Sequence, residues 1–139
     1  VCESVSAERY AAVREHTDVY TARAIIDIFL RDEVVHAKLG FVLLPDALDG
    51  LERVHGEAAV ASLVAAELPM VFRELDGTIG LDAERNGLPD PGVLPPGNPG
   101  VVTPATDALA FYDAIEGRII PRLEACGIPA SRSWRARWG

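Results

Sequence analysis

An apolar stripe that contains two ligand-type residues constrains this chain more than any other feature. The stripe has the three-and-four spacing of one helix face and runs through Ala22, Ile25, Ile26, Phe29, Glu33, His36 and Gly40. We therefore expect the Glu33 carboxylate and the His36 imidazole to continue a buried face. Burying a lone charge is costly, and a metal ion removes that cost because it binds carboxylate and neutral imidazole together.

The spacing Glu-x-x-His lets one helix offer two ligands to one metal. By itself it also fits a half-buried ion pair or a hydrogen-bonded core histidine. Glu3 favours the metal, because it lies in an earlier helical segment that ends near Thr17 and Asp18. Glu3 is about 14 residues before this turn and Glu33 about 15 after it, so at ~1.5 Å per residue an antiparallel hairpin brings both to one level.

The pattern of the whole chain predicts an all-α fold with a single domain. Helices are expected over 1–16, from Thr17 or Asp18 to Leu44, over 47–54, over 57–76 and over 106–125. Pro45 should stop or kink the second of these helices, and Pro69 should kink the fourth. Either Thr103 or Thr106 is expected to cap the last helix.

Residues 77–105 separate the first helices, 1–76, from the C-terminal helix and tail, 106–139. They hold six of the ten prolines and six of the twelve glycines, which predicts a long irregular excursion. It would cover an open end of the helices, contact a partner or form a plain surface loop. We expect the two tryptophans of the tail, Trp134 and Trp138, to dock on the body of the protein or on a partner.

Composition excludes several classes of protein. The net charge of −8 argues against a nucleic-acid or anionic-membrane partner, because both need a basic surface. Two cysteines, Cys2 and Cys126, are too few for a disulfide framework and favour a reducing, cytoplasmic setting. The chain opens at Val1 without methionine, which we interpret as a fragment of a longer protein, with a processed natural start as the alternative.

Two segments carry a family resemblance. The stretch from Val1 to Ser6, the turn near Asp18 and the stretch from Leu30 to Phe41 resemble the second helix pair of ferritin-like di-iron carboxylate proteins. The resemblance covers about the first 44 residues and is looser over 105–134. Val35 is a departure, because family members often carry arginine directly before the histidine.

The resemblance implies a ferritin-like helical bundle with a two-metal site of iron, with manganese as the alternative metal. Glu3 would be a terminal carboxylate ligand, Glu33 a bridging carboxylate and His36 a terminal nitrogen ligand. Asp32 would support a ligating histidine from outside the coordination sphere. Tyr10, two turns from Glu3, would line the site or serve in packing alone.

One helix pair is half of such a site. The other ligands would come from a missing N-terminal helix pair or from a second copy of the chain about a two-fold axis. The function expected from the resemblance is a di-iron oxidase or oxygenase that uses dioxygen. Two alternatives stay open: a non-enzymatic helical interaction module with a buried Asp32, Glu33 and His36 network, and an iron-storage protein.

Overall fold

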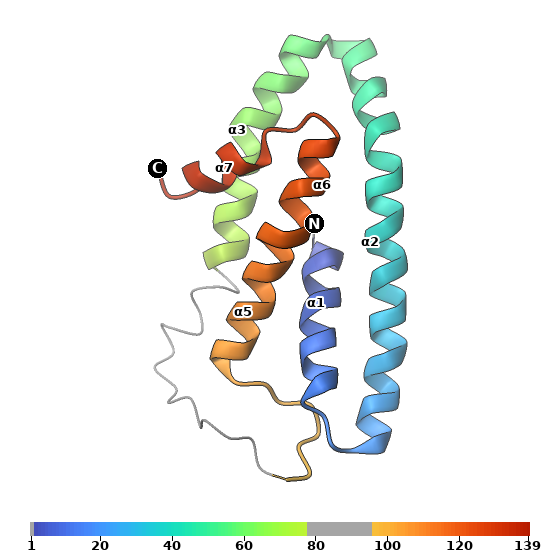
Figure 1. Ribbon diagram of the computed structural model, residues 1–139. Coiled ribbons are helices and arrows are strands. Elements are labelled where there is room, and N and C mark those ends of the chain that lie inside the picture. Colours follow the sequence, from blue (N-terminus) through green and yellow to red (C-terminus); the bar gives the residue numbers. More distant parts are fainter. Residues whose placement is uncertain (1, 78–95) are drawn as a thin grey trace.

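The computed structural model describes residues 2–77 and 96–139, and within them every regular element is helical (Figure 1). Successive long helical rods along the chain run in alternating directions, and the short helix near the C-terminus lies across the helix over residues 57–75. No helix in these residues is both long enough and apolar enough to cross a membrane. The predicted all-α class is confirmed.

The elements follow one another along the chain as α1 (Cys2–Glu15), α2 (Tyr20–His55), α3 (Glu57–Leu75), α5 (Pro104–Ala114), η2 (Ile115–Ile119), α6 (Ile120–Ala125) and α7 (Ala130–Ala136). Together α5, η2 and α6 form one continuous rod. Its middle, η2, has a wider π-helical turn and ends two residues before Pro121, where a regular ladder would need an N–H that proline lacks. The α1 helix lies between this rod and α2 (Figure 1).

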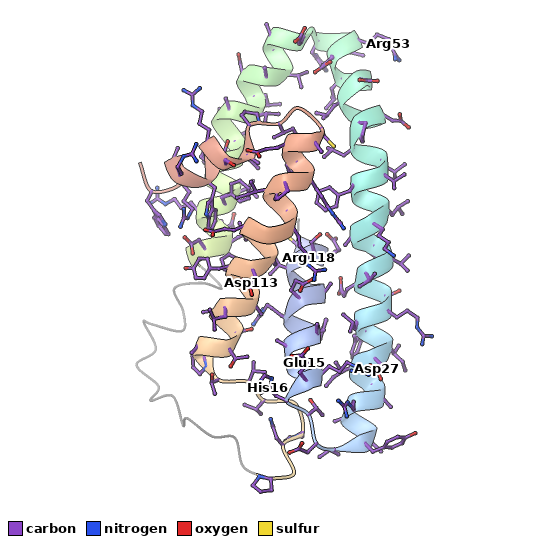
Figure 2. All side chains as sticks on the ribbon, in the orientation of Figure 1. Glu15, His16, Asp27, Arg53, Asp113 and Arg118 are labelled. Atoms are coloured by element: carbon purple, nitrogen blue, oxygen red, sulfur yellow. The ribbon has the colours of Figure 1, made fainter. Side chains whose placement is uncertain are left out.

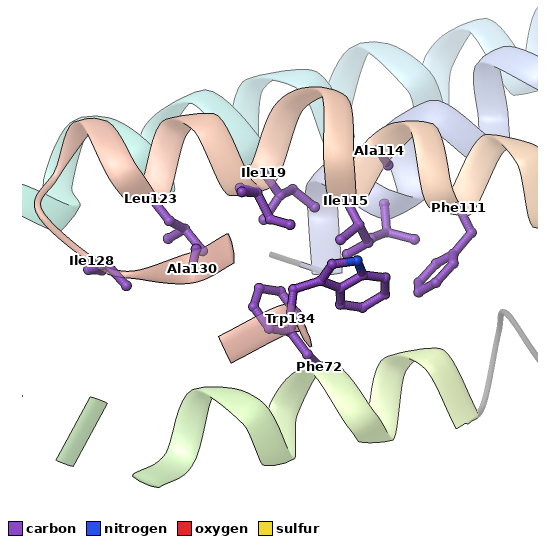
Figure 3. Packing of buried hydrophobic residues seen from close by; sticks show 11 residues of the cluster. Phe72, Phe111, Ala114, Ile115, Ile119, Leu123, Ile128, Ala130 and Trp134 are labelled. Carbon is purple, nitrogen blue, oxygen red and sulfur yellow. The ribbon is translucent and has the colours of Figure 1, made fainter. Parts of the chain in front are cut away.

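One apolar core holds the rod against α3 and α7 (Figure 3). Trp134 of α7 lies edge-on to Phe72 of α3, with ring centroids 5.3 Å apart, and 6.4 Å from the Phe111 ring of α5. Ile115 and Ile119 are fully buried beside them. The rod therefore has one apolar face, which is buried against α3 and α7.

The second helix does not end at Leu44 as predicted. It continues through Pro45 for another ten residues to His55, and it includes the expected short helix 47–54. Proline removes one backbone hydrogen bond, but Phe41, Leu44 and Leu48 pack against the core on both sides of it, and Pro45 itself is exposed. Tertiary packing therefore outweighs the local cost of the proline.

The predicted cap of α2 is also wrong. Val19 occupies the N-cap position without a side-chain hydrogen bond, and Thr17 donates its hydroxyl to the Val13 carbonyl, 2.6 Å away. Asn98 instead organises this turn. Its side-chain amide donates to the backbone carbonyls of His16 and Val101 at 2.8 and 2.7 Å, and its backbone carbonyl oxygen accepts from the Asp18 N–H at 3.0 Å.

Thr103 caps α5 as predicted, because its hydroxyl accepts from the Thr106 N–H at 3.1 Å. Most of the predicted Pro/Gly-rich excursion, 78–95, lies outside the described residues. The part that is described, 96–103, is irregular as expected and is fastened to the turn between α1 and α2 through Asn98.

The tail docks on the body of the protein, as predicted, although its helix α7 was not expected. Asp76, only 1 % exposed, accepts hydrogen bonds from the Tyr112 hydroxyl at 2.9 Å, the Arg137 guanidinium at 2.6 Å and the Trp138 indole at 3.0 Å. Arg137 also lies 3.5 Å above the Trp134 ring. One carboxylate thus joins α3, α5 and the C-terminal segment.

We expect Gly100→Ala to lower the free energy of unfolding by about 2–3 kcal/mol. Gly100 has a φ of +119°, and a Cβ there would lie 3.2 Å from Val13 Cγ1 and 3.3 Å from Ile26 Cδ1. Gly97→Ala is the matched control, because Gly97 also has positive φ but nothing within 4 Å. It should cost about 1 kcal/mol. Urea unfolding measures both, and equal losses would contradict a steric role for Gly100.

We expect Asp76→Ala to lower the free energy of unfolding by about 3–5 kcal/mol, because it leaves the Arg137 guanidinium, whose side chain is 19 % exposed, without its partner and removes the buried acceptor of Tyr112 and Trp138. Asp76→Asn keeps an acceptor and should cost less. Asp113, exposed on α5 (Figure 2), supplies the control Asp113→Ala, with an expected change within about 0.5 kcal/mol. Tryptophan fluorescence in urea follows all three variants. Near-equal losses for Asp76→Ala and the control would contradict the role of this carboxylate.

Candidate metal half-site

Two of the predicted ligands, Glu3 of α1 and His36 of α2, line one pocket of about 160 Å³. The antiparallel packing of α1 on α2 brings them there from residues far apart in the sequence. The rest of the pocket is apolar and comprises Ala37, Gly40, Phe41, Leu44 and Leu123. The pocket lies where the N-terminal end of α1 meets α2 and α6.

The other predicted residues lie close by on α2 but do not line this pocket. Glu33 is half-buried, one helical turn before His36. Glu3 therefore lies level with His36 to Gly40, about one turn further along α2 than a strict pairing with Glu33 would place it. The Asp32 carboxylate lies 3.9 Å from His36 Nε2, too far for a hydrogen bond, and its side chain is 70 % exposed.

The expected burial of the α2 stripe is only partly found. Ile26 is buried and Glu33 half-buried, whereas the His36 side chain is 54 % exposed and the stripe positions Ile25 and Phe29 are exposed as well. The reason is geometric. The α1 helix packs on the neighbouring flank of α2 and reaches the flank that carries His36 only at its edge, where Tyr10 stacks on Phe29, so Ile25, Phe29, Leu39 and Leu43 stay about half exposed. The imidazole therefore stays accessible in the single chain.

This half-exposed flank has a regular pattern of its own. Its residues recur at intervals of four and three, the spacing of a coiled-coil seam, and we name the seam the open flank of α2: Ile25, Phe29, Asp32, His36, Leu39 and Leu43. The four apolar members are each about half exposed. The seam continues through Ala47 and Gly50 to Val54. Sequence reasoning missed it, although the heptad spacing was readable.

A second Glu-x-x-His, Glu52 to His55, lies at the end of the same helix and was also missed. Its histidine is exposed and its glutamate half-buried. It begins 19 residues after Glu33, which at ~1.5 Å per residue is about 28 Å along α2. The two motifs of one chain therefore cannot share a metal, and among residues 2–77 and 96–139 no group of three His, Cys, Asp or Glu side chains forms around the second motif.

Tyr10 packs against α2, with its ring stacked 5.7 Å from the Phe29 ring. It also lines a separate pocket of about 250 Å³ beside Arg9 and Asp107. The Arg9 guanidinium donates two hydrogen bonds to the Asp107 carboxylate, Nε to Oδ1 and Nη2 to Oδ2, both at 2.6 Å. The Asp107 carboxylate raises the pKa of Arg9. Tyr10 thus has a packing role, and the charges beside it, Arg9 and Asp107, are paired with each other.

The donor set fits iron or manganese, since both take mixed carboxylate and imidazole ligands. Within the described part of the chain, however, no three His, Cys, Asp or Glu side chains lie close enough together to hold a metal ion. Glu3 and His36 can therefore supply part of a site, with Glu33 at its edge. Further ligands must come from outside this arrangement.

Comparison of the chain with protein-family models, with curated proteins and with solved structures gave no match.

We expect Gly40→Ala to raise the free energy of unfolding of the isolated chain by about 0.5–1 kcal/mol, because alanine favours a helix interior and nothing lies within 4 Å of a Cβ there. Gly50→Ala, in the same helix and equally unobstructed, is the matched control. Urea unfolding at low protein concentration measures both. A loss at Gly40 alongside a gain at Gly50 would mean that another surface covers the pocket in solution.

Proposed function

We propose that this chain contributes a metal half-site to a ferritin-like di-iron carboxylate protein that uses dioxygen as an oxidase or oxygenase. One observation carries the proposal: α1 and α2 bring Glu3 and His36 into a single pocket, with Glu33 one turn away. Two carboxylates and one imidazole from two antiparallel helices are what one helix pair supplies to such a centre. Iron is the proposed metal, and manganese is the alternative.

The residues have distinct roles in this proposal. Glu3 and His36 would hold one metal from opposite helices, and Glu33 would supply a further carboxylate to the two-metal site. The apolar walls, among them Phe41 and Leu44, limit access of water to the pocket. Iron bound there would supply the electrons for the reduction of dioxygen. Asp32, on the exposed side of α2, is available to a histidine of the partner helices.

A second pair of helices must complete the site, and the open flank of α2 supports a second copy of the chain as its source. The seam from Ile25 to Val54 has its midpoint at Leu39 and Gly40. Antiparallel pairing about a two-fold axis at this midpoint would place each His36 about 5 Å along the helix from the axis. Gly40 has no side chain, so the two backbones could approach closely there. A longer form of the chain with two more ligand-bearing helices is the other source.

A non-enzymatic interaction module is the second candidate, and the same seam favours it. A polar pair within an otherwise apolar seam, here Asp32 and His36, fixes the register of paired helices without any metal. Both candidates need a helical partner, and they differ in whether the pairing depends on iron.

The test is anaerobic loading of the chain with ferrous iron, followed by measurement of iron content and mass in solution on the same fraction. We expect about one iron per chain in a dimer. Glu3→Ala, Glu33→Ala and His36→Ala should each lower the iron content to less than about a tenth, because one chain supplies so few ligands. Uptake of iron without oxidation of any organic compound would favour storage.

The second Glu-x-x-His supplies the matched control. Glu52→Ala and His55→Ala remove the same residue types at the same spacing in the same helix, and they should leave the iron content unchanged. A folded chain that remains metal-free after loading, or iron content that does not depend on Glu33 and His36, would contradict the metal proposal. A metal-free dimer would then support the interaction module.

A further inference from the structure

A third pocket, of about 390 Å³, lies on the other side of the contact between α2 and α6. Its walls are Phe41 and Val42 of α2 and Ala125 and Cys126 at the end of α6, and two cations, Lys38 and Arg122, lie among them. The volume is within the range of small-molecule sites. No part of the proposed metal site uses Lys38 or Arg122.

Within residues 2–77 and 96–139, neither cation of this pocket forms an ion pair with a carboxylate. Some of the other arginines do pair with carboxylates, among them Arg9 with Asp107, Arg118 with Glu8 and Arg137 with Asp76. Arg122 instead lies over the Phe41 ring, 5.1 Å from its centroid. Lys38 is the only lysine of the chain and is exposed on α2.

The apolar walls of the pocket indicate that its ligand has an apolar part besides its negative charge. Val42 is 69 % exposed and the Phe41 ring forms one wall, so an apolar chain would bury surface that now faces water. The planar guanidinium of Arg122, stacked on that ring, matches a carboxylate or phosphate group. The charged and apolar parts thus lie side by side in one hollow.

We propose that this pocket binds a small organic anion with an apolar tail. Lys38 and Arg122 hold the anionic head, and Phe41, Val42 and Ala125 hold the tail. Phe41 also lines the pocket of Glu3 and His36, so its ring separates the anion site from the metal half-site. The anion site does not need metal, and it can be tested independently of the proposed function.

The single lysine makes the test specific. Reductive methylation with ¹³C-formaldehyde places a dimethyl label on Lys38 and preserves its charge, and the resolved label on the α-amine serves as an internal reference. Titration with decanoate should shift the Lys38 signal to saturation. Decanol, which lacks the charge, and inorganic phosphate, which lacks the tail, should not shift it at the same concentrations.

Variants then assign the two parts of the site. Arg122→Gln should weaken decanoate binding about fivefold, as expected for an exposed charge pair, and Val42→Ser about twofold. Arg53→Gln is the matched control, because Arg53 is exposed on α2 far from the pocket (Figure 2), and it should change nothing. Absence of a saturable shift, a shift of equal size with decanol or phosphate, or equal binding by Arg122→Gln would overturn the proposal.

Discussion

The buried carboxylate of Asp76 is the interaction on which the arrangement of the helices depends. Asp76 lies at the C-terminal end of α3. Its carboxylate accepts hydrogen bonds from the Tyr112 hydroxyl of α5 and from the Arg137 guanidinium and the Trp138 indole of the C-terminal segment. A buried charge is costly unless it is hydrogen-bonded, so the three segments stabilise one another through this carboxylate. Trp134 then closes the core between Phe72 and Phe111.

This arrangement leaves α2 asymmetric. Its inner side packs on α1 and on the core through Phe41, Leu44 and Leu48, while the open flank keeps four large apolar residues exposed. Exposed apolar surface in a regular seam is typical of an interaction site. Glu3, Glu33 and His36 lie at the border between the covered and the half-exposed sides of α2, where a partner helix would meet them. The proposed metal half-site and the proposed partner thus depend on the same flank.

Sequence patterns predicted the helices well, since apolar periodicity reports which side of a helix is covered. They placed the end of α2 too early, because the cost of Pro45 is local and the packing of Leu44 and Leu48 is not. They also assigned the turn after α1 to Thr17 or Asp18, whereas Asn98, about 80 residues later, holds it. Such long-range hydrogen bonds leave no periodic signal in the sequence.

The sequence by itself determined the all-α class, the pairing of α1 with α2 and the ligand-type residues Glu3, Glu33 and His36, because these follow from local spacing. Only the tertiary structure decided that Glu3 shares its pocket with His36 and not with Glu33. It also decided that the His36 flank stays about half exposed and that Lys38 and Arg122 line one pocket. The reason is that the level and rotation of packed helices are set by contacts across the whole core, which no single segment encodes.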